Sequence, residues 1–233
     1  IAAHEDVIPV EKLYEYCQIA RKILTGEHAV GRVIARPFTG RFPDFKRTSN
    51  RHDFSFEPPS DTFLDEIKAA GLQTIAVGKI NDIFAGCGIT EFIRTIDNSD
   101  GMAKTFDYIK KDWQGLLFVN LVDFDMKYGH RNDPIGYAQA LNIFDCELKI
   151  LLELMKKNDV LMITADHGCD PGTESTDHSR EYVPLLIFGD KIMMGADIKT
   201  RKSFADAGKT VCDMLDVSSK ISGSSFKNLI VRK

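Results

Sequence analysis

The chain has 233 residues, 43% of them hydrophobic, which suits one large globular domain or two smaller ones with a buried core. Its formal net charge of -4 gives no indication of a nucleic-acid partner or an anionic membrane surface, and no apolar run is long enough to span a bilayer. The first residues lack a signal-peptide pattern, and the five cysteines show no paired spacing. We therefore expect reduced thiols in a cytoplasmic protein.

The N-terminal part of the chain predicts a small α+β unit. Apolar residues spaced by three and four predict an amphipathic helix over residues 11–25. Residues 29–38 have the pattern of a strand ended by Pro37, and residues 39–60 form a loop rich in Arg, Pro and Ser. Pro58–Pro59 marks a predicted domain boundary.

After this boundary, helices alternate with unbroken apolar strands. Helices are predicted from Ser60 or Asp61 to Gly71 and over residues 101–115, 134–158 and 203–216, and strands over residues 72–80, 116–125, 160–166 and 183–189. Such alternation is typical of a mostly parallel sheet sandwiched by helices. We predict an α/β core domain over residues 58–233 and a separate, smaller α+β element over residues 1–57.

Carboxylates and histidines collect where two of these strands end. The core domain holds three of the six histidines, and all three follow such strand ends, where ligands gather in open parallel sheets. A single Asp-His pair is usually solvated or caps a helix, but the combined pattern favours a metal site. Imidazole and carboxylate suit Zn, Mn, Fe or Co, and two ions a few ångströms apart clamp a phosphoryl transfer. The predicted ligands are Asp125, His130, Asp166, His167 and His178.

Two residues near these ligands have more than one interpretation. Asp123 lies two residues before Asp125, so a strand would give both side chains the same facing. We favour Asp125 as the ligand and Asp123 as a neighbouring or structural residue. Cys169 is a further candidate ligand, although a small filler residue in a loop is the commoner role.

Several segments resemble the bacterial phosphopentomutases, a family of the alkaline-phosphatase-like metalloenzymes. The resemblance rests on "NLVDFDMKYGHRNDP", "ITADHGCDPGTESTDHSREYVPLL" and "GRVIARPF...RTSNRHDF", and covers nearly the whole chain. It implies interconversion of ribose 1-phosphate and ribose 5-phosphate, and of the deoxyribose pair, through a phosphorylated Thr and a sugar bisphosphate. It also implies two Mn ions, with Zn or Mg as alternatives. One would be held by Asp166 and His167, and the other by Asp125, His130 and His178.

The same resemblance implies parts that this chain does not hold. Family members carry, upstream of the segments matched here, a strand ending in a metal-binding Asp and the Thr nucleophile. We therefore expect the C-terminal part of such an enzyme, without the catalytic Thr and inactive alone. Residues 1–57 would be part of a cap domain that excludes water from the site.

Basic residues near the predicted cap are candidates for phosphate binding. Arg32 and Arg36 share one strand face, Arg51 follows in the loop, and Lys79 ends a core strand. Arg is usually solvated surface charge, but a mutase must hold a second phosphate, to which Arg binds bidentately. We predict phosphate contacts from Arg32, Arg36, Arg51 and Lys79, with Arg47 less favoured. A monomer acting on a small sugar phosphate is expected.

Two other functions stay open. A cofactor-independent phosphoglycerate mutase or a phosphatase of the same superfamily would share the metal ligands but differ in cap and substrate. A non-catalytic metal-binding fragment is the other alternative. The segment "GRVIARPF...NRHDF" favours the pentose enzyme.

Overall fold

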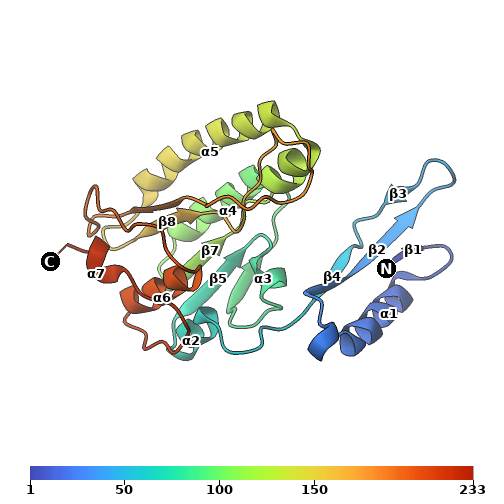
Figure 1. The fold of residues 1–233 in the computed structure, drawn as a ribbon, viewed down its shortest axis with the longest axis horizontal. Helices are drawn as coiled ribbons and strands as arrows, with labels where there is room; N and C mark the ends of the chain where they lie inside the picture. The colour runs from blue at the N-terminus through green and yellow to red at the C-terminus, as the bar shows by residue number, and fades with distance from the viewer. Residues whose placement is uncertain (233) are drawn as a thin grey trace.

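A computed structural model describes residues 1–232 and shows two groups of secondary structure, joined by an extended segment around Pro58 (Figure 1). The first group is a small sheet with one helix on it. In this sheet β2 (Arg32–Thr39) pairs in parallel with β1 (Ala2–His4) and antiparallel with β3 (Lys46–Arg47) and β4 (His52–Ser55). The short 3-10 turn η1 (Gly26–His28) leads into β2.

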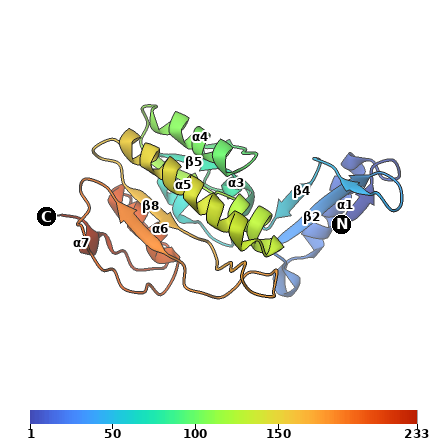
Figure 2. The same cartoon turned by 90° about the horizontal axis from the view of Figure 1, so that it is seen from above.

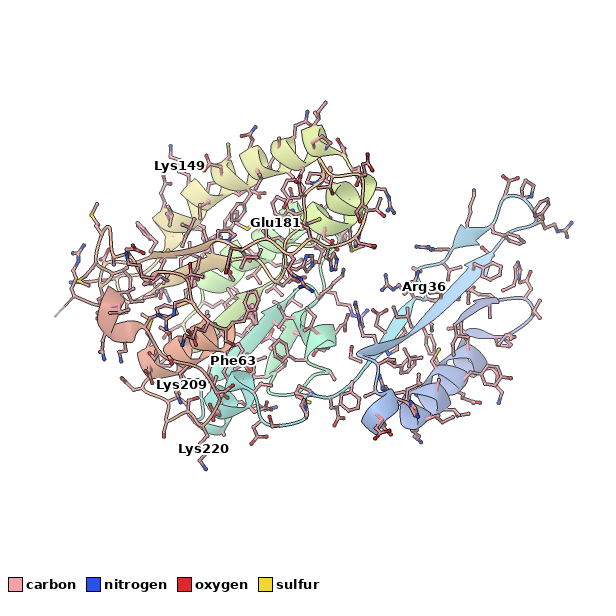
Figure 3. The ribbon with its side chains drawn as sticks, in the orientation of Figure 1. Arg36, Phe63, Lys149, Glu181, Lys209 and Lys220 are labelled. Atoms are coloured by element: carbon pink, nitrogen blue, oxygen red, sulfur yellow. The ribbon has the colours of Figure 1, made fainter. Side chains whose placement is uncertain are left out.

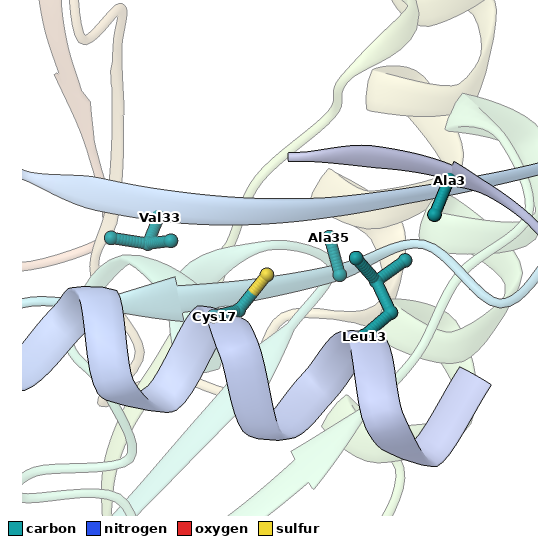
Figure 4. Close-up of a cluster of buried hydrophobic side chains, with 5 residues drawn as sticks. All are labelled: Ala3, Leu13, Cys17, Val33 and Ala35. Carbon is teal, nitrogen blue, oxygen red and sulfur yellow. The ribbon is translucent and has the colours of Figure 1, made fainter. Parts of the chain in front are cut away.

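Helix α1 (Val10–Ile23) covers one face of this sheet, as its apolar spacing predicts. Leu13 and Cys17 are both 0% exposed and pack against Val33 and Ala35 of β2 (Figure 4). Side chains alternate along a strand, so the charged residues Arg32 and Arg36 lie on the opposite face of β2.

The prediction that Pro37 ends the strand over residues 29–38 is wrong, because β2 continues through it to Thr39. A proline cannot donate a ladder hydrogen bond, but none is required here. The partner β4 pairs only as far as Ala35, and β3 begins its pairing at Phe38. Pro37 sits at the change of partner, where its carbonyl still accepts the N–H of Thr48 at 3.2 Å.

The second group contains a three-stranded parallel sheet covered on both faces. Strand β5 (Gln73–Val77) lies between β6 (Glu91–Ile93) and β7 (Gly115–Val119). Helices α2 (Phe63–Ala69) and α6 (Ala205–Met214) lie on one face, and α4 (Asn98–Ile109) and α5 (Pro134–Leu154) on the other (Figures 1 and 2). The short helix α3 (Ile80–Ile83) follows β5. This is the predicted α/β architecture.

Helix boundaries follow local capping. Helix α2 begins after Thr62 rather than at Ser60 or Asp61, because Thr62 and Asp65 form a capping box. Helix α4 begins three residues earlier than predicted, since the Asp97 side chain accepts the N–H of Asp100 at 2.9 Å. Among residues 1–232, no helix combines the length and apolar character needed to cross a membrane.

The last two strands do not extend the parallel sheet. Strands β8 (Leu161–Thr164) and β9 (Leu185–Phe188) pair antiparallel with each other, and α7 (Lys227–Ile230) packs beside them through Ile230. A parallel pair needs a crossover, usually a helix, whereas the chain between β8 and β9 is an irregular loop that returns directly. That loop carries three of the predicted metal ligands, Asp166, His167 and His178.

Candidate metal centre

The segment that carries Asp125 differs from the predicted strand. β7 ends at Val119, Asp123 has helical backbone angles (φ -69°, ψ -30°), and a π-helical turn η2 follows over Phe124–Tyr128. The 3-10 turn η3 (Gly129–Arg131) carries His130. The prediction that Asp123 and Asp125 face the same way on one strand is therefore wrong, because neither residue lies in a strand. Asp123 bonds to Asn98 of α4, whereas Asp125 faces the histidines.

The carboxylate of Asp125 lies between two imidazoles. Its Oδ1 atom is 3.2 Å from Nε2 of His130 and also 3.2 Å from Nε2 of His178. This oxygen is buried and has no hydrogen-bond partner among residues 1–232. A buried carboxylate oxygen that faces two imidazole nitrogens is stabilised by a cation bound among them, so this donor set fits a metal ion.

The hydrogen bonds of the imidazoles agree with that indication. Nδ1 of His130 lies 2.5 Å from the carbonyl oxygen of Thr176, which only accepts, so this nitrogen carries the proton. In the neutral ring, Nε2 then presents a lone pair toward Asp125. Such a lone pair facing a carboxylate oxygen at 3.2 Å suits a cation, and a hydrogen bond from the other ring nitrogen to a carbonyl is typical of metal-ligating histidines.

The other two predicted ligands, His167 and Asp166, lie beside His130 and His178. The ring of His167 stacks on that of His178 with centroids 3.6 Å apart, and the ring of His130 lies 5.0 Å from His178. Ligand atoms of Asp125, His167 and His178 all lie within 4.8 Å of one another. Asp166 is at the rim, with its side chain 65% exposed and its Oδ1 3.7 Å from Nε2 of His167.

A glycine beside His167 keeps the two halves of this loop together. The Ser179 N–H donates to the Gly168 carbonyl at 3.0 Å and forms an isolated β-bridge. A Cβ atom at Gly168 would lie 2.8 Å from the Ser179 carbonyl oxygen and would also meet Glu181, which is labelled in Figure 3. Gly168 was not predicted as a site residue, although a glycine directly after an Asp-His pair is a visible signal.

Cys169 packs beside the turn that carries His130. Its Sγ packs against Gly129, in space that a side chain at position 129 would occupy. Burial, followed by the negative charge of Asp125, raises the pKa of the Cys169 thiol, so the protonated form is favoured. All five cysteines are free in the described part of the chain.

Two of the predicted phosphate-binding residues, Arg51 and Arg32, form a charged cluster with Asp53. Arg51 makes a bidentate pair with the Asp53 carboxylate at 2.9 and 3.0 Å, and Arg32 Nη1 lies 3.4 Å from it. Burial lowers the pKa of Lys79, opposed by Asp125 and reinforced by Arg51 and Arg32. The charges of Asp125 and of the two arginines therefore both act on the Lys79 ammonium group.

The remaining arginines lie outside this cluster. Arg36 is exposed on the face of β2 away from α1 and is labelled in Figure 3. Arg47 is exposed on β3, at the far end of β2 from Arg32.

Comparison with known proteins agrees with a metal site. The family model described as "Metalloenzyme superfamily" matches residues 29–219, so the chain belongs to this superfamily. Among curated proteins, it is 56% identical over 233 residues to a phosphopentomutase of Lachnoclostridium phytofermentans. It is 56% identical over 231 residues to one of Acetivibrio thermocellus and 55% over 232 residues to one of Clostridium novyi.

These matches take in 99–100% of this chain but 60% of each relative, so the chain spans about three fifths of their length. They confirm the resemblance to phosphopentomutases noted in the sequence.

Proposed function

We propose that this chain forms the metal-binding core and part of the cap of a phosphopentomutase. The reaction would interconvert ribose 1-phosphate and ribose 5-phosphate, and the deoxyribose pair. The proposal draws on relatives that carry this name. The single observation that carries it is the buried Oδ1 of Asp125, which has no hydrogen-bond partner among residues 1–232 and faces Nε2 of His130 and His178 at 3.2 Å.

The donor set fits two divalent cations. Asp125, His130 and His178 would hold one ion, and Asp166 and His167 would hold the second. The two sites would adjoin, because ligand atoms of His167, Asp125 and His178 all lie within 4.8 Å of one another. We propose Mn as the ion, with Zn or Mg as alternatives that the same donors admit. When bound, such ions neutralise charge on a transferring phosphoryl group and favour an ionised hydroxyl nucleophile.

The basic residues would hold the phosphate that is not being transferred. Arg32 and Arg51 now bind Asp53, so an incoming phosphate would compete for the same N–H groups. Arg is suited to this because its planar fork binds phosphate bidentately. Lys79 would neutralise charge between that phosphate and the metal ligands, and Arg36 would contact the sugar phosphate from the same face of β2 as Arg32.

Residues 1–57 would act as part of a cap, and residues 58–233 as the core domain. A closed cap excludes water, so that the phosphoryl group passes to a sugar hydroxyl rather than being hydrolysed. The nucleophilic Thr would come from sequence outside these 233 residues, so we expect this chain alone to bind ions without turnover. We also propose a monomer in the cytoplasm, a location suggested by the free cysteines.

Calorimetric titration of the metal-free chain with Mn²⁺ tests the site. We expect Asp125→Ala and His178→Ala to weaken binding by more than the ~10–100-fold that loss of an outer hydrogen-bond partner costs. Asp107→Asn and His28→Ala are matched controls, since both residues are exposed and remote from the ligands. Unchanged affinity in both ligand variants would refute the proposed centre.

Titration of the Mn-loaded chain with two phosphates tests the substrate. We expect ribose 5-phosphate to bind more tightly than 3-phosphoglycerate, and Arg32→Ala and Arg51→Ala to weaken that binding, with exposed Arg41 as the control position. Preference for phosphoglycerate would favour the other mutase, and binding of Mn²⁺ without either phosphate would favour a non-catalytic fragment. Rapid conversion of ribose 1-phosphate by this chain would contradict an external nucleophile.

A further inference from the structure

The segment that carries Asp125 needs support from outside its own strand. β7 ends at Val119, and Asp125 lies six residues further on, within the single π-helical turn η2. Such turns are rare and occur frequently at functional sites. Because an isolated turn has little stability of its own, the place of Asp125 depends on whatever anchors the start of η2.

Asp123 provides that anchor through a reciprocal pair of hydrogen bonds. Its Oδ2 accepts the backbone N–H of Asn98 at 3.0 Å, and its own backbone N–H donates to Asn98 Oδ1 at 2.9 Å. Lys127 also donates to Asp123 Oδ2, at 2.9 Å, and so ties the far part of η2 back to its start. Asp123 is 7% exposed, so its carboxylate is largely shielded from bulk water. We refer to the Asn98–Asp123 pair as the clasp.

The other half of the clasp belongs to a rigid element. Asn98 is the first residue of α4, which packs against β5 and β7 through buried residues such as Met102. A Cβ atom at Gly101 would lie 3.0 Å from Cδ2 of Leu121, so the first turn of α4 already sits close against the chain after β7. The clasp therefore fixes the start of η2 to a packed helix.

We propose that Asn98 and Asp123 are positioning residues of the metal centre. The clasp holds η2 so that Oδ1 of Asp125 lies 3.2 Å from Nε2 of both His130 and His178. This inference rests on the metal site proposed above. Neither clasp residue touches the ion, and both act through the backbone that connects Asp123 to Asp125.

Metal titration of clasp variants tests the proposal. Asn98→Ala and Asp123→Ala should weaken Mn²⁺ binding about tenfold or more, the loss typical of outer residues that orient ligands. Asp123→Asn should recover part of the affinity, because its amide oxygen still accepts the Asn98 N–H. The control is Thr105→Val in the same helix, which removes a buried hydrogen bond of 2.8 Å to Gly101 without touching the clasp. The visible absorption of the Co²⁺-loaded variants should shift only when the clasp is broken.

The outcomes separate positioning from general stability. The proposal holds if the clasp variants lose affinity while Thr105→Val, at a similar loss of thermal stability, binds as the wild type does. It is overturned if the clasp variants bind normally, or if Thr105→Val loses as much affinity. Should Asp123→Ala not fold, Asn98→Ala carries the same test. Normal Mn²⁺ binding by Asp125→Ala would reject the metal centre itself. If Asp125→Ala loses affinity while the clasp variants bind Mn²⁺ normally, only the role of the clasp is rejected.

Discussion

Backbone carbonyls help to orient two of the three histidine rings. Nδ1 of His130 bonds to the Thr176 carbonyl, and Nδ1 of His167 lies 3.0 Å from the Gly168 carbonyl. Both carbonyls belong to the loop between β8 and β9, so the course of this loop decides where the Nε2 lone pairs point. Outer partners of this kind fix the tautomer and the ring orientation of metal ligands.

Gly168→Ala should therefore weaken metal binding. The new Cβ would lie 2.8 Å from the Ser179 carbonyl oxygen, so the bridge that holds His167 beside His178 must open. We expect Mn²⁺ affinity to fall about tenfold or more in calorimetric titration. Gly31→Ala is the control, since a Cβ there meets nothing within 4 Å. Equal affinity in the two variants would show that the bridge does not matter.

Asp206 should make stability depend on pH in the acidic range. The backbone N–H of Ser224, followed by Arg201, holds the pKa of this buried carboxyl below its ordinary value. A lowered folded-state pKa adds stability that is complete above the unfolded value, about 3.9, and is lost as the pH falls through the folded value.

Asp206→Asn should then cost about 1.5–3 kcal/mol near pH 7 and clearly less near pH 3, measured by urea unfolding at both values. Asp107→Asn, at an exposed position, should change stability by less than about 0.5 kcal/mol. A cost for Asp206→Asn that does not vary with pH would rule out the charge as its cause.

At the scale of elements, sequence patterns predicted what depends on local periodicity. The apolar spacing of residues 11–25 gave α1, and the unbroken apolar runs gave β5, β7, β8 and β9. Patterns failed where partners distant in sequence decide the structure. Val119 ends β7 because pairing with β5 stops there, although the apolar run continues. The π-helical turn depends on the contact with Asn98, which lies on another helix.

The predicted site shows the same division. The collection of histidines and carboxylates after strand ends was visible in the sequence, and the structure brings their side chains together. The roles of Asn98 and Gly168 were not visible, because each depends on a contact made across the fold: Asn98 with Asp123, and Gly168 with Ser179. The antiparallel pairing of β8 with β9 was missed, although the irregular segment between them offers no crossover helix, which a parallel pair usually needs.

The contact between α1 and β2 should carry much of the stability of the N-terminal sheet. Leu13 is 0% exposed and packs in a small cluster with few other buried side chains (Figure 4). Leu13→Ala should cost about 2–5 kcal/mol in urea unfolding of this part of the chain. Ile19→Ala, on the same helix but 56% exposed, should change stability by less than about 0.5 kcal/mol. Similar costs for the two variants would contradict this packing.

At the scale of the whole molecule, the metal donors come from parts of the fold that no strand ladder joins. Asp125 and His130 follow β7 of the parallel sheet, whereas His167 and His178 lie in the loop between β8 and β9. Within residues 1–232, these two sheets share no strand pairing. An ion bound by both groups would therefore connect two sheets that otherwise touch through helices and loops.

Metal binding should for this reason stabilise the whole chain. A ligand at a hundred times its Kd adds about 2.7 kcal/mol, which corresponds to a rise in Tm of about 5–10 °C for a chain of this size. We expect this rise when Mn²⁺ is added to the chelator-treated protein in a thermal scan. His178→Ala should abolish this rise in Tm, because the loop between β8 and β9 then loses the imidazole that would bind the same ion as Asp125. His28→Ala should leave the rise unchanged. A rise that survives both Asp125→Ala and His178→Ala would show that the ion binds elsewhere.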